Sequence, residues 1–140
     1  MSLDFERYEG LAGFRFALRR FLAASESISR RAGVTQQQYQ AMLAIKTWST
    51  EAMTMKDLSE QLLLTHHAAV QLVNRLAKAG LVERTPSAAD RRSVILTLTP
   101  TGLDVVDALA ARHLEEMLRQ EPLLAKSLRK LRKIGAERGE

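Results

Sequence analysis

The sequence predicts a mainly α-helical protein in which a helix-turn-helix is followed by a small β-hairpin wing. Three observations lead to this fold class. Apolar residues recur at helical spacing over most of the chain, two short helical segments near its middle are joined by only a few residues, and two strand patterns follow them at once. The 140 residues, of which 46% are hydrophobic and 26% charged, have the composition of one globular domain.

The first third of the chain predicts two helices. Residues 3–30 carry an apolar stripe at helical spacing, and Gly33 closes this helix. Thr35 begins a second helix, because Thr35 and Gln38 have the spacing of a capping box, in which a hydroxyl and an amide satisfy two backbone N–H groups. The apolar positions are Leu11, Phe14, Leu18, Phe21, Leu22 and Ile28 in the first helix, and Tyr39, Met42 and Leu43 in the second.

A helix-turn-helix is predicted next. Thr54 begins a short helix with Asp57 at the capping-box position. Thr65 caps a further helix, whose end is marked by Gly80. The residues expected to pack between these two helices are Leu58, Leu62, Leu72, Val73 and Leu76. The second helix then exposes mostly hydrogen-bonding side chains, which are Thr65, His66, His67, Gln71, Asn74, Arg75 and Lys78.

The hairpin and two C-terminal helices complete the predicted order. Residues 81–84 and 93–99 have strand patterns, separated by a turn-rich loop at 86–90. Pro100 follows a capping threonine and starts a fifth helix that runs to about residue 119. Pro122 is expected to break it and to start a sixth, amphipathic and basic helix. The apolar residues of that last helix are Leu124, Leu128, Leu131 and Ile134.

Composition excludes several classes of function. The chain has no cysteine, which excludes disulfides and thiolate metal sites. It also has no nucleophile motif, no phosphate-binding glycine loop and no carboxylate pair near a histidine, so we expect no catalytic residues and no cofactor. No apolar run is long enough to cross a bilayer and the N-terminus is acidic, which predicts a cytoplasmic protein. A net charge of +5 points toward a polyanionic partner.

The histidines are not expected to hold a metal ion. His66 and His67 are adjacent on a helix, so their side chains point about 100° apart, and no third ligand lies nearby in the sequence. Exposed DNA contacts are the favoured interpretation of this pair. His113 lies at the margin of an apolar face, where a packing histidine is favoured over a ligand or a pH sensor.

The second helix of the helix-turn-helix has the chemistry of a DNA recognition helix. Such a helix enters the major groove with its N-terminal side chains near base edges. Gln71 can pair with adenine, and histidine can donate to guanine or to a phosphate. Arg75 and Lys78 lie further along, where phosphate contacts are expected. The side chains expected near base edges are Thr65, His66, His67 and Gln71.

The tip of the wing is the second candidate contact. Asp90, Arg91 and Arg92 lie in the loop between the strands, and a guanidinium is attracted into a narrow, A·T-rich minor groove. An acidic residue beside a polyanion needs another role. We expect the Asp90 carboxylate to hold an arginine side chain by a fork-shaped hydrogen bond before DNA arrives.

These residues resemble the MarR family of bacterial winged helix-turn-helix transcriptional regulators. The segments that carry the resemblance are Leu58, Leu62, the helix Thr65–Ala79, Gly80-Leu81-Val82-Glu83-Arg84, Asp90-Arg91-Arg92 and Leu96-Thr97-Leu98-Thr99-Pro100-Thr101-Gly102. The resemblance implies a homodimeric repressor that binds a pseudo-palindromic operator in double-stranded DNA. It assigns Arg92 to the minor groove with Asp90 as its orienting acid. Val70 and Gln71 depart from the family pattern, which commonly has a Ser or Thr and an Arg there.

The resemblance also implies an organisation of the chain. Residues 1–140 would form a single domain, with a winged helix-turn-helix at 35–99 and dimerisation helices at 1–33 and 100–138. A small-molecule effector would act by changing the spacing of the two recognition helices. Phe16, Tyr39 and Trp48 are either the lining of an effector pocket or plain core.

Two further alternatives remain open at this stage. The basic helix at residues 122–138 fits either a dimer seam flanked by solvated charge, which is favoured, or a membrane surface. The rival to DNA binding is a winged helix that binds protein or a membrane surface instead of nucleic acid. Salt-dependent DNA binding distinguishes these functions, because phosphate contacts release counterions.

Overall fold

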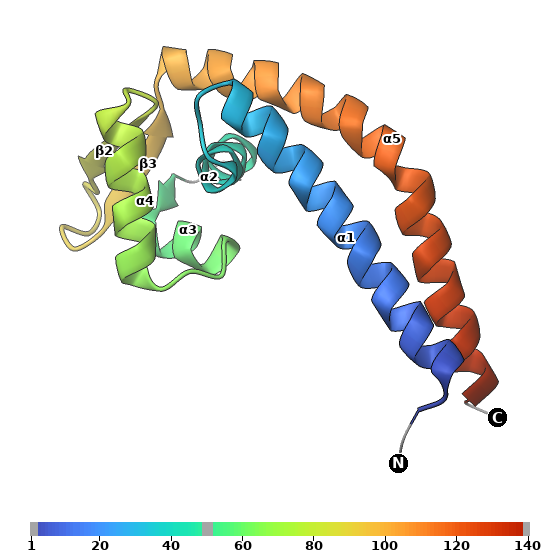
Figure 1. Ribbon diagram of the computed structural model, residues 1–140. Helices are drawn as coiled ribbons and strands as arrows, with labels where there is room; N and C mark the ends of the chain where they lie inside the picture. Colours follow the sequence, from blue (N-terminus) through green and yellow to red (C-terminus); the bar gives the residue numbers. More distant parts are fainter. Residues whose placement is uncertain (1–2, 49–51, 139–140) are drawn as a thin grey trace. The chain divides into compact units, whose positions relative to one another are not determined.

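The computed structural model describes residues 3–48 and 52–138 of the chain (Figure 1). Five helices and three short strands lie within these residues. In chain order they are α1 (Phe5–Arg31), α2 (Gln36–Thr47), β1 (Met53–Thr54), α3 (Met55–Gln61), α4 (His66–Lys78), β2 (Val82–Pro86), β3 (Val94–Leu98) and α5 (Pro100–Arg138). The predicted fold class is confirmed.

The chain forms two compact units. The central unit consists of Ser29–Ala111 and holds α2, α3, α4, the sheet and the first part of α5. The terminal unit consists of Met1–Ile28 and Arg112–Glu140, which are most of α1 and the rest of α5. The helix-turn-helix and its wing therefore belong to one unit, and the ends of the two long helices belong to the other.

Both predicted capping boxes are present. At the start of α2, the Thr35 hydroxyl accepts from the Gln38 N–H at 3.0 Å, and the Gln38 side chain accepts from the Thr35 N–H at 2.9 Å. At the start of α3, Thr54 and Asp57 make the same reciprocal pair at 3.2 and 3.0 Å. Each box satisfies two N–H groups that a helix start otherwise leaves open.

The core of the central unit lies where the helices meet a three-stranded antiparallel sheet of order β1-β3-β2. The largest fully buried apolar side chains of this unit are Met42, Leu58, Val73, Leu76, Leu96, Val106 and Leu109. The sequence did not predict β1, which pairs Met53 with Leu96. Two residues are too few to show the alternation that marks a strand, and Thr54 also serves as a helix cap.

Three helices end in the same hydrogen-bonding pattern, in which the residue at the C′ position has a positive φ angle. Gly33 after α1 and Gly80 after α4 occupy that position with φ of 81° and 75°, as their predicted roles require. Leu63 occupies it after α3 with φ of 55°. The Leu63 side chain is 92% exposed, so little burial compensates the strain of a left-handed leucine.

Replacing Leu63 with glycine is expected to stabilise the fold by about 0.5–1 kcal/mol. The glycine relieves the left-handed strain, and its greater freedom in the unfolded chain offsets part of that gain. Urea unfolding followed by circular dichroism measures the change. Leu63→Ala is the control, because alanine keeps the Cβ and should bring no comparable gain. A less stable glycine variant would contradict the assignment.

The predicted break at Pro122 is wrong, because α5 continues through this residue to Arg138. Proline has no N–H to donate to the carbonyl of Leu118, one turn earlier. Leu118 and Pro122 are both exposed, so water can satisfy that carbonyl. Good helix formers, Leu and Ala among them, follow the proline and continue the helix.

Hydrogen bonds connect the start of α5 to the turn that follows α4. The Thr99 N–H donates to the Leu81 carbonyl at 3.1 Å, and the Thr99 hydroxyl donates to the Gly80 carbonyl at 2.6 Å. The same hydroxyl accepts from the Gly102 N–H at 3.0 Å and so caps α5. A Cβ placed on Gly102 would lie 2.1 Å from the Leu81 oxygen, so glycine is required at this close approach.

In the terminal unit, α1 and the second part of α5 pack together. Gly10 permits the approach, because a Cβ there would lie 2.8 Å from Ile134 and 3.4 Å from Leu131. Both helices nevertheless leave large apolar side chains exposed, namely Phe5, Tyr8, Leu11, Phe16 and Leu22 on α1 and Leu114, Met117, Leu118 and Leu128 on α5. Within the described residues, no helix combines the length and hydropathy that crossing a bilayer requires.

Candidate nucleic-acid interface

The helix α4 has one buried face and one polar face, as predicted. Its buried residues are Ala69, Leu72, Val73 and Leu76, none more than 3% exposed. The side chains predicted to reach DNA from this helix are all exposed, and they are Thr65, His66, His67, Gln71, Asn74, Arg75 and Lys78. The Thr65 hydroxyl accepts from the Ala68 N–H at 3.1 Å. Thr65 therefore caps α4 and keeps its hydroxyl proton to donate.

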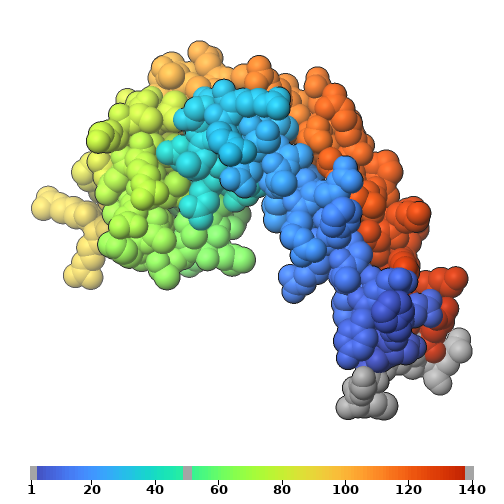
Figure 2. All heavy atoms as spheres, in the orientation of Figure 1, coloured from blue at the N-terminus to red at the C-terminus, as the bar shows by residue number. Residues whose placement is uncertain are grey.

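The wing tip stands out from the surface of the central unit (Figure 2, yellow). Its turn is built by short polar bonds. The Ser87 N–H donates to the Ser93 carbonyl at 3.0 Å, which closes the loop. The Ser87 hydroxyl accepts from the N–H groups of Ala89 at 3.2 Å and Asp90 at 3.3 Å. These bonds fix the course of the backbone that carries the exposed Arg91 and Arg92.

Asp90 orients the wing by a different contact from the one the sequence suggested. Its carboxylate accepts from the backbone N–H of Arg92 at 3.0 Å and from the Ser93 hydroxyl at 3.3 Å. Within the described part of the chain, the predicted fork to a guanidinium is not formed. An aspartate two residues before an N–H readily makes such a turn, because its side chain is short. The Arg92 guanidinium is thereby left to contact other groups.

Arg84 joins the wing to α4 through a contact that the sequence did not predict. Its guanidinium donates to the side-chain carbonyl of Asn74 on α4. Strand alternation could have indicated the side of β2 on which Arg84 lies, because it shares a strand face with the buried Val82. β2 contacts α4, and the bond from Arg84 to Asn74 joins these two elements. The bond is a direct link between the two elements predicted to enter neighbouring grooves.

A basic groove lies between α4 and the wing. It has a volume of about 460 Å³ and is lined by Thr54, Met55, Lys56, His66, Val70, Arg84, Arg92, Ser93 and Val94. Four different segments bring Lys56, His66, Arg84 and Arg92 to its walls. None of the described residues that line it is acidic. The groove therefore has the electrostatic character of an anion site that extends from α4 to the wing tip.

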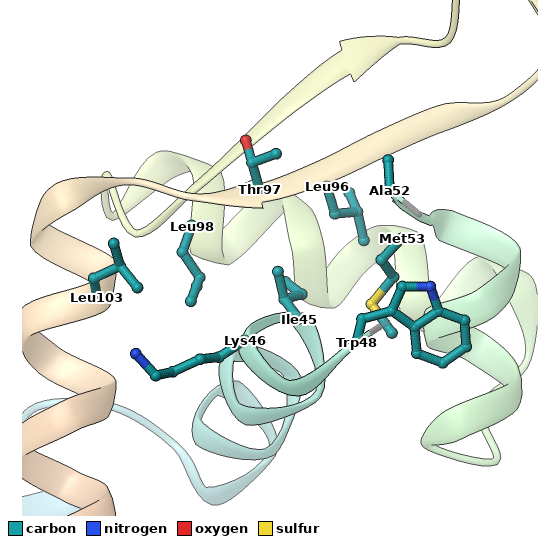
Figure 3. A pocket seen from close by; sticks show the side chains of 9 residues that line it. All are labelled: Ile45, Lys46, Trp48, Ala52, Met53, Leu96, Thr97, Leu98 and Leu103. Carbon is teal, nitrogen blue, oxygen red and sulfur yellow. The ribbon is translucent and has the colours of Figure 1, made fainter. Parts of the chain in front are cut away.

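The three residues suggested for an effector pocket have different environments. Tyr39 is only 6% exposed and belongs to the core of the central unit, where burial raises the pKa of its hydroxyl. Trp48 is half-buried and lines a cavity whose other walls do not include Tyr39 (Figure 3). Phe16, in the terminal unit, is 50% exposed, and the Arg20 guanidinium lies 5.9 Å from its ring centre. Their joint role stays a prediction.

The three histidines of the chain lie in two kinds of environment. His66 and His67 lie on the exposed start of α4, whereas His113 is 5% exposed, which favours packing for the latter. Among the residues that the structure describes, no three His, Asp or Glu side chains gather closely enough to hold a metal ion.

Comparison with known proteins finds one family and several solved structures. Residues 32–93 match the model of the MarR family. Over 69 residues, the chain is 36% identical to the organic hydroperoxide resistance transcriptional regulator of Bacillus subtilis, an alignment that covers 49% of this chain and 46% of that protein. The chain thus spans about half the length of this curated relative.

The solved structures extend the likeness in fold to almost the full length of the chain. AbsC, a MarR family transcriptional regulator from Streptomyces coelicolor, has a TM-score of 0.81 at 20% identity, with 100% of this chain and 99% of AbsC covered. A mutant of MarR from E. coli, complexed with operator DNA, has a TM-score of 0.69 at 21% identity, with 88% of each chain covered.

Proposed function

We propose that this chain, whose residues 32–93 match the model of the MarR family, is a homodimeric, sequence-specific DNA-binding regulator of transcription that represses its target genes. Its partner is double-stranded DNA with a pseudo-palindromic operator, and it acts in the cytoplasm. Binding, rather than catalysis, is its activity. The proposal does not depend on bulk charge, because it places a few basic side chains at defined points of one surface.

The observation that supports this function most strongly is the continuous surface of α4, the basic groove and the wing tip. α4 would enter the major groove with its polar face, which begins at the Thr65 cap. Arg92 would reach the adjacent minor groove from the wing tip. The DNA phosphates between the major and the minor groove would then lie against the basic groove of the protein, where Lys56 and Arg84 are placed.

The homodimer is supported by the terminal unit. Phe5, Tyr8 and Leu11 follow one another at three-residue spacing on α1, and Leu114 lies three and four residues before Met117 and Leu118 on α5, so each helix exposes apolar side chains grouped on one face. Patches of this kind mark interaction surfaces in water-exposed proteins. A second copy of the chain would cover them and would set two recognition helices about one turn of DNA apart.

The first experiment is enrichment of random DNA duplexes on the purified chain, followed by sequencing and by titration at several salt concentrations. Enrichment of one two-fold symmetric sequence, with affinity that falls as salt rises, is the expected result. Absence of any salt-dependent DNA binding would overturn the proposal in favour of a winged helix that binds protein or a membrane surface.

Replacing Arg92 with alanine is expected to weaken binding to the enriched operator about 5- to 150-fold, equivalent to about 1–3 kcal/mol. The Asp90 carboxylate holds the backbone N–H of residue 92, so alanine keeps the wing turn intact. Fluorescence anisotropy of labelled operator measures the loss. Arg129→Ala, which removes an exposed arginine of α5 instead, is the matched control. Equal affinity of the Arg92 variant and the parent would contradict the minor-groove role.

A further inference from the structure

The second part of α5 carries a run of basic residues that the proposed DNA-binding surface does not use. From Pro122 to Ala136 the helix contains five lysines and arginines and no acidic residue. Lys126, Lys130 and Lys133 are spaced four and three residues apart, so their side chains leave the helix on one side. These three residues form a lysine stripe. The two arginines of the run each precede a stripe lysine by one residue and are turned about 100° away from it.

The positive charge of the lysine stripe is open to a ligand. All three lysines are exposed. Among the residues that the structure describes, Lys126 and Lys133 make no ion pair, and Lys130 makes one, with its Nζ 3.5 Å from Oε1 of Glu9 on α1. The side chains of that pair are 48% and 56% exposed, so water screens their attraction and the pair holds the lysine only weakly.

We infer that the lysine stripe is a second DNA-binding surface, which contacts the phosphates of a duplex without reading its sequence. The three lysines extend over about 10 Å of α5, because a helix rises about 1.5 Å per residue. Duplex DNA carries one negative charge for about every 1.7 Å of its axis. A duplex that follows the stripe therefore presents a phosphate to each lysine. Lysine suits this contact, because its ammonium is a compact charge on a flexible stem.

The packing of α5 favours DNA over a membrane surface. A helix lies on a bilayer by inserting an apolar face, which its basic residues flank. Here Leu131 and Ile134 instead pack against α1, which runs beside this part of α5 (Figure 1). Ile134 is only 6% exposed. Leu128 is exposed, but it is two residues from Lys126 and from Lys130 and so is turned about 160° from both. The stripe thus offers charge without an adjoining apolar face.

The lysine stripe and the helix-turn-helix belong to different units of the chain. The stripe lies in the terminal unit, whereas α4 and the wing lie in the central unit. The charges of one surface can therefore be removed while those of the other stay. Binding of DNA by the stripe stands apart from the proposed function. Its consequence, that a chain on its operator holds a second duplex as well, rests on that function.

The first experiment removes charge from the helix-turn-helix and its wing and measures the DNA binding that remains. Variant S carries Lys56→Gln, Arg91→Gln and Arg92→Gln, all at exposed positions. The probe is a fluorescent duplex of two helical turns without an operator. With three phosphates contacted, anisotropy should show affinity falling about 40-fold between about 50 and 200 mM salt. No binding at the lower salt would overturn the surface, and binding only to phosphatidylserine vesicles would replace DNA by a membrane.

The second experiment adds three glutamines to variant S, at Lys126, Lys130 and Lys133. The slope of log affinity against log salt should then fall by about 2–3, since each lost phosphate contact removes about 0.9. The control adds Arg15→Gln, Arg20→Gln and Arg31→Gln instead, which removes the same charge from exposed positions that are not three or four residues apart. Equal losses would show that net charge alone binds DNA, and an unchanged slope in the lysine variant would equally overturn the stripe.

A third experiment tests the stripe by a gain of affinity, which damage to the fold does not produce. Replacing Glu9 with glutamine in variant S frees Lys130 and removes a negative charge beside it. Affinity for the probe should rise about two- to fivefold. Glu26→Gln is the control, because this exposed acid lies about 25 Å further along α1, beyond the Debye length of about 10 Å. No gain with Glu9→Gln, or equal gains in both, would overturn the assignment.

The last experiment asks whether one protein holds two duplexes. Operator DNA on beads is loaded with the parent chain and then mixed with the fluorescent probe. The parent should retain the probe, whereas a chain with only the three lysine changes should bind operator equally well and retain less probe. If the parent retains none while the first titration succeeds, bridging is overturned and the surface stands. If no operator is found, the proposed function fails, and the titrations of variant S still test the stripe.

Discussion

Replacing Gly102 with alanine is expected to destabilise the protein by about 3 kcal/mol, the upper end of the usual cost of overpacking. The added Cβ would lie 2.1 Å from the carbonyl oxygen of Leu81 and 3.0 Å from its carbonyl carbon. The obstacle is backbone, so no side-chain rotation can relieve it. The first turn of α5 must move away from the end of α4, and this stretches the bonds that Thr99 makes to Gly80 and Leu81.

Gly13→Ala is a matched control, because both glycines are helical and only their surroundings differ. Nothing lies within 4 Å of a Cβ placed on Gly13. Alanine there should stabilise α1 by about 0.5–1 kcal/mol, the usual difference in helix propensity. Urea unfolding at one fixed protein concentration measures both variants, since stability of an oligomer depends on concentration. Two changes of the same sign would contradict the close contact between α5 and Leu81.

The features that the sequence predicted well are those decided within a few neighbouring residues. The boxes of Thr35 with Gln38 and of Thr54 with Asp57 each need only a four-residue pattern. Gly33 and Gly80 end their helices because the C′ position requires a positive φ, which glycine adopts without strain. The polar face of α4 likewise follows from the 3.6-residue period alone.

The features that were missed depend on partners distant in sequence or on competing effects. β1 becomes a strand because β3 pairs with it, not because two residues have a pattern. Pro122 removes one hydrogen bond, but the helix on both sides outweighs that loss. The Asp90 carboxylate could accept a hydrogen bond either from a guanidinium or from a nearby backbone N–H. The tight turn places the N–H of Arg92 within reach.

The same division applies to the candidate site. Periodicity identified which side chains of α4 face outward, and the loop position identified Arg91 and Arg92 as exposed. Strand alternation could have indicated the side of β2 on which Arg84 lies, but not its partner Asn74, which is ten residues away on another element. Nor could it identify the basic groove, which four separate segments create together. Which charged side chains lie close together depends on the tertiary structure, whereas the composition gives only the net charge.

Replacing Leu114 and Leu118 together with glutamate is expected to convert the proposed homodimer into monomers. The two leucines are 60% and 66% exposed in the single chain, and their four-residue spacing places them on one face of α5. Burial of each against a second copy would contribute about 1.5–3 kcal/mol, and each interface contains both leucines twice. Four carboxylates in place of these side chains would oppose association by repulsion as well.

These positions are better targets than Leu131, because Leu131 is half-buried beside Gly10 within the same chain. A charge at Leu131 would disturb packing inside the protomer and would not separate association from folding. Leu114 and Leu118 lose little burial in the monomer, so circular dichroism of the glutamate variant should still show a helical protein. The control is methionine at both positions, which keeps an apolar face and should keep the dimer.

Sedimentation velocity over a range of protein concentrations distinguishes the two states, and operator titration reports the consequence. A monomer binds each half-site separately, so the advantage of linking two recognition helices is lost and operator affinity should fall by at least about 100-fold. A glutamate variant that sediments as a stable dimer would place the seam elsewhere. A monomer with undiminished operator affinity would instead show that the apolar face of α5 serves a purpose other than joining two DNA-binding surfaces.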